Sequence, residues 1–351
     1  MIQRHSEDTQ TLHAELMALL LAVEGARSWS HLAGSFTEKT VAGRVYVYFQ
    51  YSDPGGSRRQ FAIGPRSRAV TAVVERHRAG RLQLDAELAP IERLARLLRA
   101  AGLTGVPHAV ARVLRGLADA GVFGLGGVLI GTYAFVMLGN LLGAHWPAGA
   151  WNTQDVDLAG DLTVAAPALE ADVPKALDSL QMGFVPVPQL DPRHASTSFK
   201  VRGKQLRVDL VTPGSDRDQS PVFLARFRAA AAPIKFLSLL LEDVQPAAAV
   251  DSGAVLVRVP APARYALHKL LISQMRSVPQ QTKSQKDLHQ AALLLEVLAE
   301  DRPDDLESAA RRFAKPGDTV RKKVLRALLA VDKRWPDAAA GARIVLRSLR
   351  D

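Results

Sequence analysis

The sequence predicts an α+β protein, in which a small mixed sheet is preceded by a helix and a β-meander and followed by a C-terminal helical domain. Two observations predict this class. Runs of strand-forming residues occur at residues 40–63 and again within residues 121–215, whereas apolar residues at helical spacing prevail after residue 216. The chain of 351 residues, 48% of them hydrophobic, is long enough for several cores, and we expect it to divide into residues 1–120, 121–215 and 216–351.

The N-terminal extension is expected to begin with a helix over residues 9–25, where Leu and Ala recur at helical spacing. Residues 40–63 then alternate as strands do, around an Asp-Pro-Gly-Gly turn, which predicts the β-meander. Its strand at residues 45–51 holds three of the five tyrosines. Two interpretations stay open: the tyrosines form the core of the small sheet, or, with Arg58 and Arg59, they form a platform for single-stranded nucleic acid.

Helices are expected on both sides of the mixed sheet. Residues 66–120 place Arg at short intervals among Ala, Leu and Val, and Pro90 and Pro107 are expected to divide this segment into separate helices. A strand of a β-hairpin is expected at residues 254–259. The C-terminal helices are expected at residues 222–243, 262–276, 283–300, 303–314 and 318–348.

The charge of the chain is unevenly distributed. Residues 1–120 carry 16 Lys and Arg against 11 Asp and Glu, residues 121–300 carry 16 against 16, and residues 301–351 carry 13 against 8. Two basic flanks favour a polyanionic partner such as nucleic acid. The absence of cysteine excludes disulfides and thiolate metal sites, and the opening MIQRHSEDTQ lacks the apolar segment of a secretory signal, so a cytoplasmic protein is expected.

Residues 120–154 contain no Asp, Glu, Lys or Arg, and an uncharged run of this length is a candidate membrane span. Its many glycines, however, break the run into a strand, a turn and a helix, and polar Asn140 and His145 lie within it. We therefore expect a soluble βα unit and no membrane segment.

Three carboxylates lie on two of the expected strands. Asp155 and Asp157 alternate with apolar residues in TQDVDL and so share one face of a strand, and Asp209 lies opposite the apolar face of the strand LRVDLV at residues 206–211. Carboxylates gathered in this way repel one another, and a divalent cation relieves the repulsion. Mg²⁺, or Mn²⁺ in its place, takes oxygen ligands together with substrate phosphates, so these acids predict a metal site for phosphoryl transfer.

A glycine turn precedes the carboxylates. In GGVLIGTYAF an apolar strand runs into Gly131-Thr132 and then into a helix. Backbone N–H groups at such a helix start, together with the Thr132 hydroxyl, are suited to hold the terminal phosphates of a nucleotide.

Together, LIGT, TQDVDL and RVDL resemble the signature of the DNA polymerase β-type nucleotidyltransferase superfamily. That signature is an apolar strand ending in Gly-Gly or Gly-Ser, then an Asp-x-Asp strand, then a single Asp on a later strand. The resemblance covers roughly residues 121–300 and implies that residues 121–215 form the catalytic core. This sequence differs in having Gly-Thr after the strand and in a longer interval between Gly131 and Asp155.

The segment RYALHKLLISQMRSVPQQTKSQKDLHQAALL is similar to the helical half of the toxin branch of this superfamily, the abortive-infection AbiEii and mycobacterial MenT-like proteins. In that branch an apolar helix carries a Lys, then an Arg, then a Lys-Asp pair. The resemblance implies that Lys269, Arg276, Lys286 and Asp287 bind the triphosphate and shape the pocket.

The resemblance implies an enzyme that binds an NTP with Mg²⁺ or Mn²⁺ and transfers its nucleoside monophosphate to an acceptor hydroxyl, releasing pyrophosphate. Asp155 and Asp157 would hold the metals, Asp209 would bind one of them and assist deprotonation of the acceptor, and Lys269 would neutralise the triphosphate. The acceptor would be RNA, such as the 3′ end of tRNA, and a partner would be a cognate antitoxin protein of a toxin–antitoxin or phage-defence system.

Two alternatives remain at this point. The acceptor is a protein or a small molecule, or the chain is a non-catalytic module that binds nucleic acid or a partner. Other chemistries are not indicated, because the histidines are scattered and no Gly-x-Ser-x-Gly, His-Glu-x-x-His or P-loop motif occurs. Tyr265 and His268 are expected to pack on a helix face.

Overall fold

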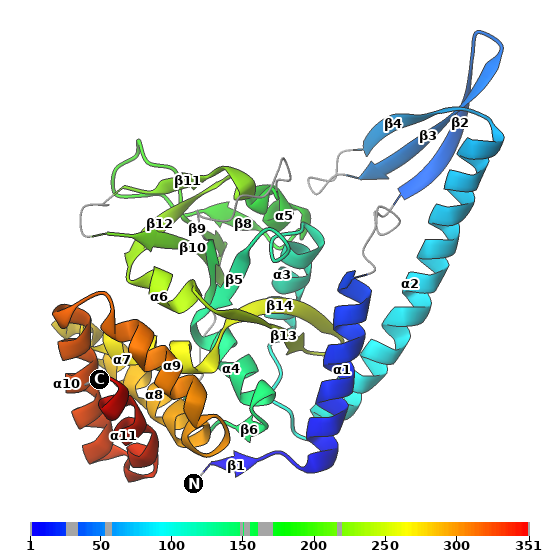
Figure 1. Cartoon of the computed structure of the whole chain (residues 1–351). Coiled ribbons are helices and arrows are strands. Elements are labelled where there is room, and N and C mark those ends of the chain that lie inside the picture. Colours follow the sequence, from blue (N-terminus) through cyan, green and yellow to red (C-terminus); the bar gives the residue numbers. More distant parts are fainter. Residues whose placement is uncertain are drawn as a thin grey trace.

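The computed structural model describes residues 2–25, 34–52, 58–147, 150, 155–160, 171–215 and 220–349. A mixed sheet lies at the centre, the C-terminal helices pack beside it, and an N-terminal arm projects to the other side (Figure 1). This arrangement confirms the expected fold class. Within the described ranges no helix is long and apolar enough to cross a membrane.

The central sheet contains seven strands. Its main path runs β11-β12-β10-β7-β5, β9 also pairs with β10, and β8 pairs with β9. The pairs β7–β10 and β10–β12 are parallel, whereas β5–β7, β9–β10 and β11–β12 are antiparallel, so the sheet is mixed. The strands span Gly127–Ile130 (β5), Asp155–Gly160 (β7), Phe184–Pro186 (β8), Ser198–Val201 (β9), Arg207–Gly214 (β10), Val222–Leu224 (β11) and Ala229–Lys235 (β12).

Apolar and acidic residues alternate along β7 and β10, which places the acids of both strands on one face. Val156, Leu158, Val208 and Leu210 are all buried in the main core, so the intervening aspartates lie on the opposite face. The apolar helix α4 (Gly131–Leu141) follows β5 directly and is buried from Tyr133 to Asn140. Helices α3 (His108–Asp119), α5 (Val173–Ser179) and α6 (Leu237–Leu241) also belong to this part of the fold.

A two-stranded hairpin links the sheet to the arm. It comprises β13 (Val244–Val250) and β14 (Ala254–Pro260), which contain the strand expected at residues 254–259. Ala248 and Val250 pack in a second, smaller core with residues of helices α1 (Glu7–Gly25) and α2 (Arg68–Ala100). The N-terminus is attached separately, because β1 (Gln3–Arg4) pairs with β6 (Ala144–His145).

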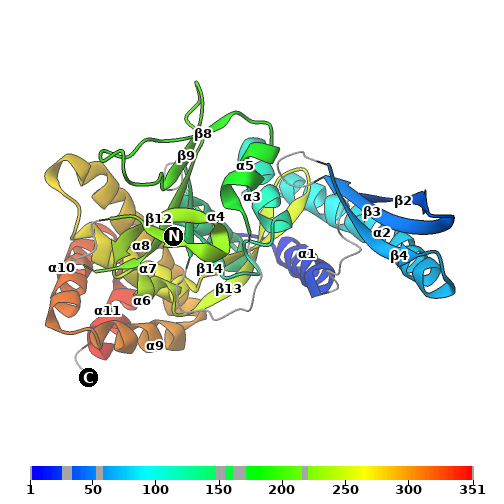
Figure 2. The same cartoon turned by 90° about the horizontal axis from the view of Figure 1, so that it is seen from above.

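The arm consists of α1, the long helix α2 and a three-stranded antiparallel sheet. Its strands are β2 (Gly34–Val41), β3 (Arg44–Ser52) and β4 (Arg58–Pro65), which confirms the expected β-meander and adds β2 to it. Figures 1 and 2 both show this sheet at the far end of α2, away from the central sheet. The expected Asp-Pro-Gly-Gly turn lies outside the described residues.

The C-terminal region is helical, as expected. Helices α7 and α8 follow the hairpin and pack against each other, and α9, α10 and α11 pack against them (Figure 1). Short 3₁₀ turns occupy residues 225–227, 278–280 and 336–338. The helices span Pro262–Ser273 (α7), Gln281–Asp301 (α8), Pro303–Ala314 (α9), Asp318–Arg334 (α10) and Ala339–Ser348 (α11).

Three expectations about helices are wrong. Residues 222–243 form β11, β12 and the short helix α6 instead of one helix. In β12, residues 229–231 pair with β11 and residues 232–235 pair with β10. Pro90 lies inside α2 and does not end it. The helix expected at residues 318–348 is interrupted at Trp335, since Pro336 cannot continue it. The division at residues 120 and 215 stays a prediction, although the sheet itself extends to Lys235.

Candidate active site

The two carboxylate-bearing strands lie next to each other in register. In the parallel pair β7–β10, Asp157 is the partner of Asp209, and Asp155 is the partner of Arg207. Asp155 is exposed at the start of β7, whereas Asp157 and Asp209 are partly buried. The structure therefore brings the three predicted acids onto one face of two adjacent strands.

The turn at Gly131 lies against Asp157. Ile130, at the end of β5, pairs with Asp157 in the antiparallel pair β5–β7, and α4 begins at the next residue. Gly131 has a φ of +68°, and a β-carbon at this position would collide with the Asp157 carboxylate. Glycine is thus required for the backbone conformation and for the close approach of the acid. The start of α4 therefore lies beside the carboxylate, and the first N–H groups of a helix have no partner within the helix.

The environment of Asp157 disfavours its ionised form. Burial, followed by the nearby charges of Asp209 and Asp155, raises the pKa of Asp157 to about 6, although Lys269 acts in the opposite direction. The mutual repulsion expected from the sequence is therefore present between these carboxylates.

Asp209 has local partners that the sequence did not reveal. Its Oδ1 accepts hydrogen bonds from the Ser198 hydroxyl and from Nε of Arg207, the latter at 2.7 Å. Arg207 also donates to the Ser198 hydroxyl, at 2.7 Å. These contacts depend on the β9–β10 pairing, in which Asp209 is the partner of Ser198. The contact between Arg207 and Asp209 could have been anticipated from RVDL, where the arginine precedes the aspartate by two residues and therefore lies on the same face of the strand.

The chemistry of these acids fits a divalent cation, because three hard oxygen donors repel one another on one face of the sheet. Their side chains do not converge, however: in the described part of the chain no group of three Asp, Glu or His side chains is arranged to hold an ion. Asp209 turns toward Arg207 and Ser198 instead. The donor set is suited to a metal through Asp155 and Asp157, with Asp209 beside them.

The predicted phosphate-binding residues form two groups near the turn. Asp287 is buried and accepts from Nζ of Lys269 at 2.7 Å and from Nε of Arg276 at 3.1 Å. Burial opposes the charge on Lys269, but Tyr265 and Asp287 raise its pKa above the usual value, so the ammonium stays protonated. Asp287 thus holds the charged side chains of Lys269 and Arg276 in place.

Lys286 approaches the glycine turn from α8. Its Nζ lies 3.2 Å from the Thr132 hydroxyl at the start of α4. Burial and the charge of Lys269 lower the pKa of Lys286. The structure therefore unites Thr132 with Lys286, residues 154 positions apart in the chain.

A cavity of about 340 Å³ joins the acidic and the basic sides. Asp157 lines it from β7 and Gly131 from the start of α4, whereas Lys269 and Arg276 line it from α7 and the segment after α7. The remaining wall is largely apolar. It includes Val211, Ile234, Leu237, Leu240, Ile272 and Met275.

Tyr265 and His268 are buried, as expected for packing residues, and both also line this cavity. The Tyr265 hydroxyl donates to the carbonyl of Gly131 at 2.8 Å. It also contacts Oε1 of Gln290, whose amide donates to the carbonyl of Ala150 at 2.7 Å. Tyr265 therefore fixes the turn from the helical side, a role that the sequence did not indicate.

Residues 108–315 match the model of the nucleotidyltransferase family. The chain belongs to this family. The matched segment contains every predicted site residue from Gly131 to Asp287 and excludes the arm. The expectation of a nucleotidyltransferase, and hence of an enzyme, is confirmed.

Among solved structures, this nucleotidyltransferase is similar to an antigenic nucleotidyltransferase-like protein from Paracoccidioides brasiliensis. The two share 14% sequence identity with a TM-score of 0.36, over 67% of this chain and 91% of that chain. No curated protein matches the sequence.

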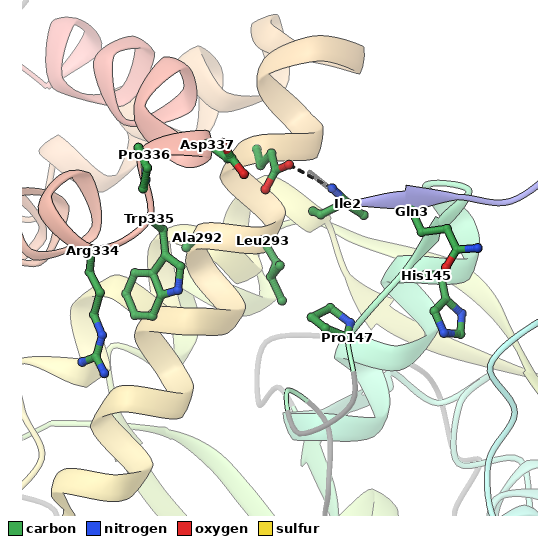
Figure 3. Close-up of a pocket in the computed structure, with 11 residues that line it drawn as sticks. Ile2, Gln3, His145, Pro147, Ala292, Leu293, Arg334, Trp335, Pro336 and Asp337 are labelled. Atoms are coloured by element: carbon green, nitrogen blue, oxygen red, sulfur yellow. Dashed lines mark hydrogen bonds between the residues drawn. The ribbon is translucent and has the colours of Figure 1, made fainter.

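The nucleotidyltransferase has a second cavity, of about 360 Å³, between the N-terminal strand and the C-terminal helices (Figure 3). Trp335, Pro147 and His145 line it, with Glu296, which accepts from the backbone N–H of Ile2 at 3.1 Å. None of the predicted site residues lines this second cavity. The cavity that contains Asp157 is therefore the candidate active site.

Proposed function

We propose that the enzyme binds an NTP with Mg²⁺ or Mn²⁺ and transfers its nucleoside monophosphate to a hydroxyl of an RNA acceptor. The observation that carries the proposal is the meeting of Asp157, the Gly131 turn, Lys269 and Arg276 in one cavity. An acidic side suited to a metal and a basic side suited to phosphates are what nucleotidyl transfer needs.

Binding of the triphosphate would use the basic side. Lys269 and Arg276, fixed by Asp287, would contact phosphate oxygens, and the N–H groups at the start of α4 with the Thr132 hydroxyl would hold the terminal phosphates. Lys286 would add a further positive charge beside Thr132. The apolar wall of the cavity leaves room for the nucleoside.

In the transfer step, the acceptor oxygen attacks the α-phosphorus and forms a new P–O bond. The bond from the α-phosphorus to the oxygen that bridges to the β-phosphorus breaks, and its electron pair leaves with pyrophosphate. A bound divalent cation, held by Asp155 and Asp157, would supply Lewis-acid stabilisation of the charge that develops on the phosphates.

Asp209 would take the proton of the acceptor hydroxyl. Its Oδ1 is engaged by Ser198 and Arg207, and among the described residues none donates a hydrogen bond to its Oδ2. Oδ2 is thus the oxygen that would accept the proton or contact the metal. Arg207 would keep the carboxylate in place during this transfer.

We further propose that the enzyme belongs to the toxin branch, with the 3′ end of tRNA as acceptor and a cognate antitoxin as partner. The basic flanks of the sequence and the Lys269, Arg276 and Lys286-Asp287 arrangement support it. Induced expression should then arrest translation through tRNAs that carry extra 3′ nucleotides. Growth arrest with unmodified tRNA would contradict this assignment.

The test of the proposal is incubation of the purified protein with total RNA, Mg²⁺ and each α-labelled NTP in turn, followed by separation of RNA, protein and small molecules. Asp155→Ala is the inactive variant, and Asp191→Ala, which removes a loop carboxylate paired with Arg193, is the matched control. We expect label on RNA with wild type and Asp191→Ala alone. Label on a polypeptide or a small molecule would overturn the RNA acceptor, and full activity of Asp155→Ala would overturn the mechanism.

A further inference from the structure

The small sheet of the arm uses its two faces differently. Phe36 and Phe49 lie on the face toward α2, where their ring centroids are 5.1 Å and 5.0 Å from that of buried His77. Tyr46 and Tyr48 alternate with Phe49 along β3 and therefore lie on the opposite face, where both remain partly exposed. The core of the sheet thus includes the two phenylalanines, and the rings of Tyr46 and Tyr48 lie outside it.

The opposite face, called here the tyrosine face, is ordered by cross-strand contacts. Nζ of Lys39 lies 5.2 Å from the centroid of the Tyr48 ring and donates to Oε1 of Gln60 at 2.7 Å. The amide of Gln60 in turn donates to the Thr37 hydroxyl at 2.9 Å. A lysine, an aromatic ring and two polar groups from three strands are therefore held together in front of solvent.

The charge on the tyrosine face is positive. Strand alternation places Arg44 and Arg58 on the same face as Tyr46, and Lys39 is its partner on β2. The described residues of the three strands contain one acid, Glu38, which alternates onto the α2 side and pairs with Arg66 at 3.3 Å. No carboxylate of the described strands therefore competes with an anion on this face.

The sheet is also placed where a long ligand can reach it. Helix α2 has 33 residues, which corresponds to about 50 Å, and the sheet lies at its outer end (Figure 2). A ligand on the tyrosine face would lie away from the cavity that contains Asp157. A long polymer could occupy both places, with one end in the cavity and a more distant stretch on the tyrosine face.

We propose that the tyrosine face binds an unpaired stretch of the acceptor RNA. Bases would stack on Tyr46 and Tyr48, and Lys39, Arg44 and Arg58 would contact the phosphates. An acidic peptide would use the cations but not the two rings, which is why a polynucleotide fits better. The identification of the polymer as RNA rests on the proposed function. The inference of a stacking surface rests only on the residues of the arm.

The test is fluorescence anisotropy of the full chain with an end-labelled, unstructured RNA of about 12 nucleotides, a length suited to a single-strand site, without NTP. Tyr46→Ala/Tyr48→Ala should weaken binding about tenfold or more, because each stacked base contributes roughly that factor. Tyr46→Phe/Tyr48→Phe should bind like wild type, since the ring and not the hydroxyl is used. Lys39→Gln/Arg58→Gln should reduce the dependence of affinity on salt.

Phe223→Ala, which removes an aromatic side chain 63% exposed on β11, is the matched control and should bind like wild type. Unchanged affinity of the double alanine variant, or equal affinity for a duplex of the same sequence, would overturn the inference. Asp155→Ala should still bind the RNA. Wild type that transfers nucleotides but does not bind this RNA would overturn the inference alone, and binding without transfer would overturn the proposed function alone.

Discussion

The carboxylate of Asp157 lies against the backbone of Gly131, so closely that a side chain at Gly131 would collide with it. Backbone pairing brings them together, because Ile130 is the strand partner of Asp157 and the chain turns at the next residue, Gly131, into α4. The distance between the acid and the helix start is therefore set by backbone pairing and not by flexible side chains. In the proposed function this contact joins the metal side of the cavity to its phosphate side.

We expect Gly131→Ala to lose activity far beyond its effect on stability. The substitution imposes an alanine at a φ of +68° and also displaces Asp157. Gly203→Ala is the matched control, because Gly203 has a φ of +72° but nothing within 4 Å of the added carbon. Both variants should lose about 1 kcal/mol of unfolding free energy, because each forces a side chain into the left-handed backbone conformation. Nucleotide transfer should fall at least about 100-fold in Gly131→Ala alone, because only this variant displaces a group at the reaction site.

Comparable activity of the two glycine variants in a transfer assay, at equal folded fraction by circular dichroism, would show that the contact between Gly131 and Asp157 is unimportant.

The cluster of Lys269, Arg276 and Asp287 makes a second prediction. Asp287→Ala should destabilise the protein by about 3 kcal/mol, because it leaves the buried ammonium of Lys269 without its partner. The measurement is urea unfolding followed by circular dichroism. Asp318→Ala, which removes an exposed carboxylate paired with Lys322 at 3.7 Å, is the control and should change the unfolding free energy little.

The double variant Lys269→Met/Asp287→Leu separates structure from function. Replacement of both charges by apolar side chains should restore most of the stability lost in Asp287→Ala. Affinity for the NTP should nevertheless remain low, since the proposed phosphate contact is gone. Recovery of nucleotide affinity together with stability, in a titration with labelled NTP, would remove Lys269 from phosphate binding.

The buried histidines predict how stability depends on pH. Burial, with Lys269, lowers the pKa of His268 from 6.5 to about 3, and burial, with His5, lowers that of His13 to about 4. Both stay neutral in the folded state while they take up protons in the unfolded state below pH 6.5. Their contribution to stability is therefore complete above pH 6.5 and is lost as the pH falls toward the folded values.

The unfolding free energy should fall by about 2 kcal/mol less between pH 7 and pH 5 in His268→Leu than in wild type. His13→Leu should reduce this fall further. Calorimetry across this range checks both variants. A decline in stability that stays as steep as that of wild type would contradict the buried, neutral state of the two histidines.

The shared face of the three acids could be predicted from the sequence because it depends on local alternation. In TQDVDL and RVDL the acids and the buried residues alternate, so the face of Asp155, Asp157 and Asp209 follows from each strand alone. The glycine turn is likewise a local feature. Lys269 and Asp287 could be placed only through the resemblance, since an exposed helix charge has the same sequence pattern.

What the sequence could not predict depends on distant pairing. The run of alanines before Pro233 has high helix propensity, but it forms strand β12 because it pairs with β11 and then, from Ala232 onward, with β10. Tyr265 and Gly131 are 134 residues apart, so their hydrogen bond had no local signal. The sequence alone does not show which face of β3 is buried, because the inner face is defined by contacts with His77 of the distant helix α2. These contacts place Tyr46 and Tyr48 on the outer face.

Cation-dependent nucleotide transfer at Asp157 is tested most directly by the release of labelled pyrophosphate from γ-labelled NTP in the presence of total RNA, measured for wild type and Asp157→Asn side by side. Asparagine keeps the size of the side chain beside Gly131 but removes the metal-binding charge. We expect RNA-dependent release by wild type and a loss of at least about 100-fold in the variant, because the Lewis-acid stabilisation that a bound cation would supply is worth several kcal/mol. Equal release by the two proteins would contradict this expectation.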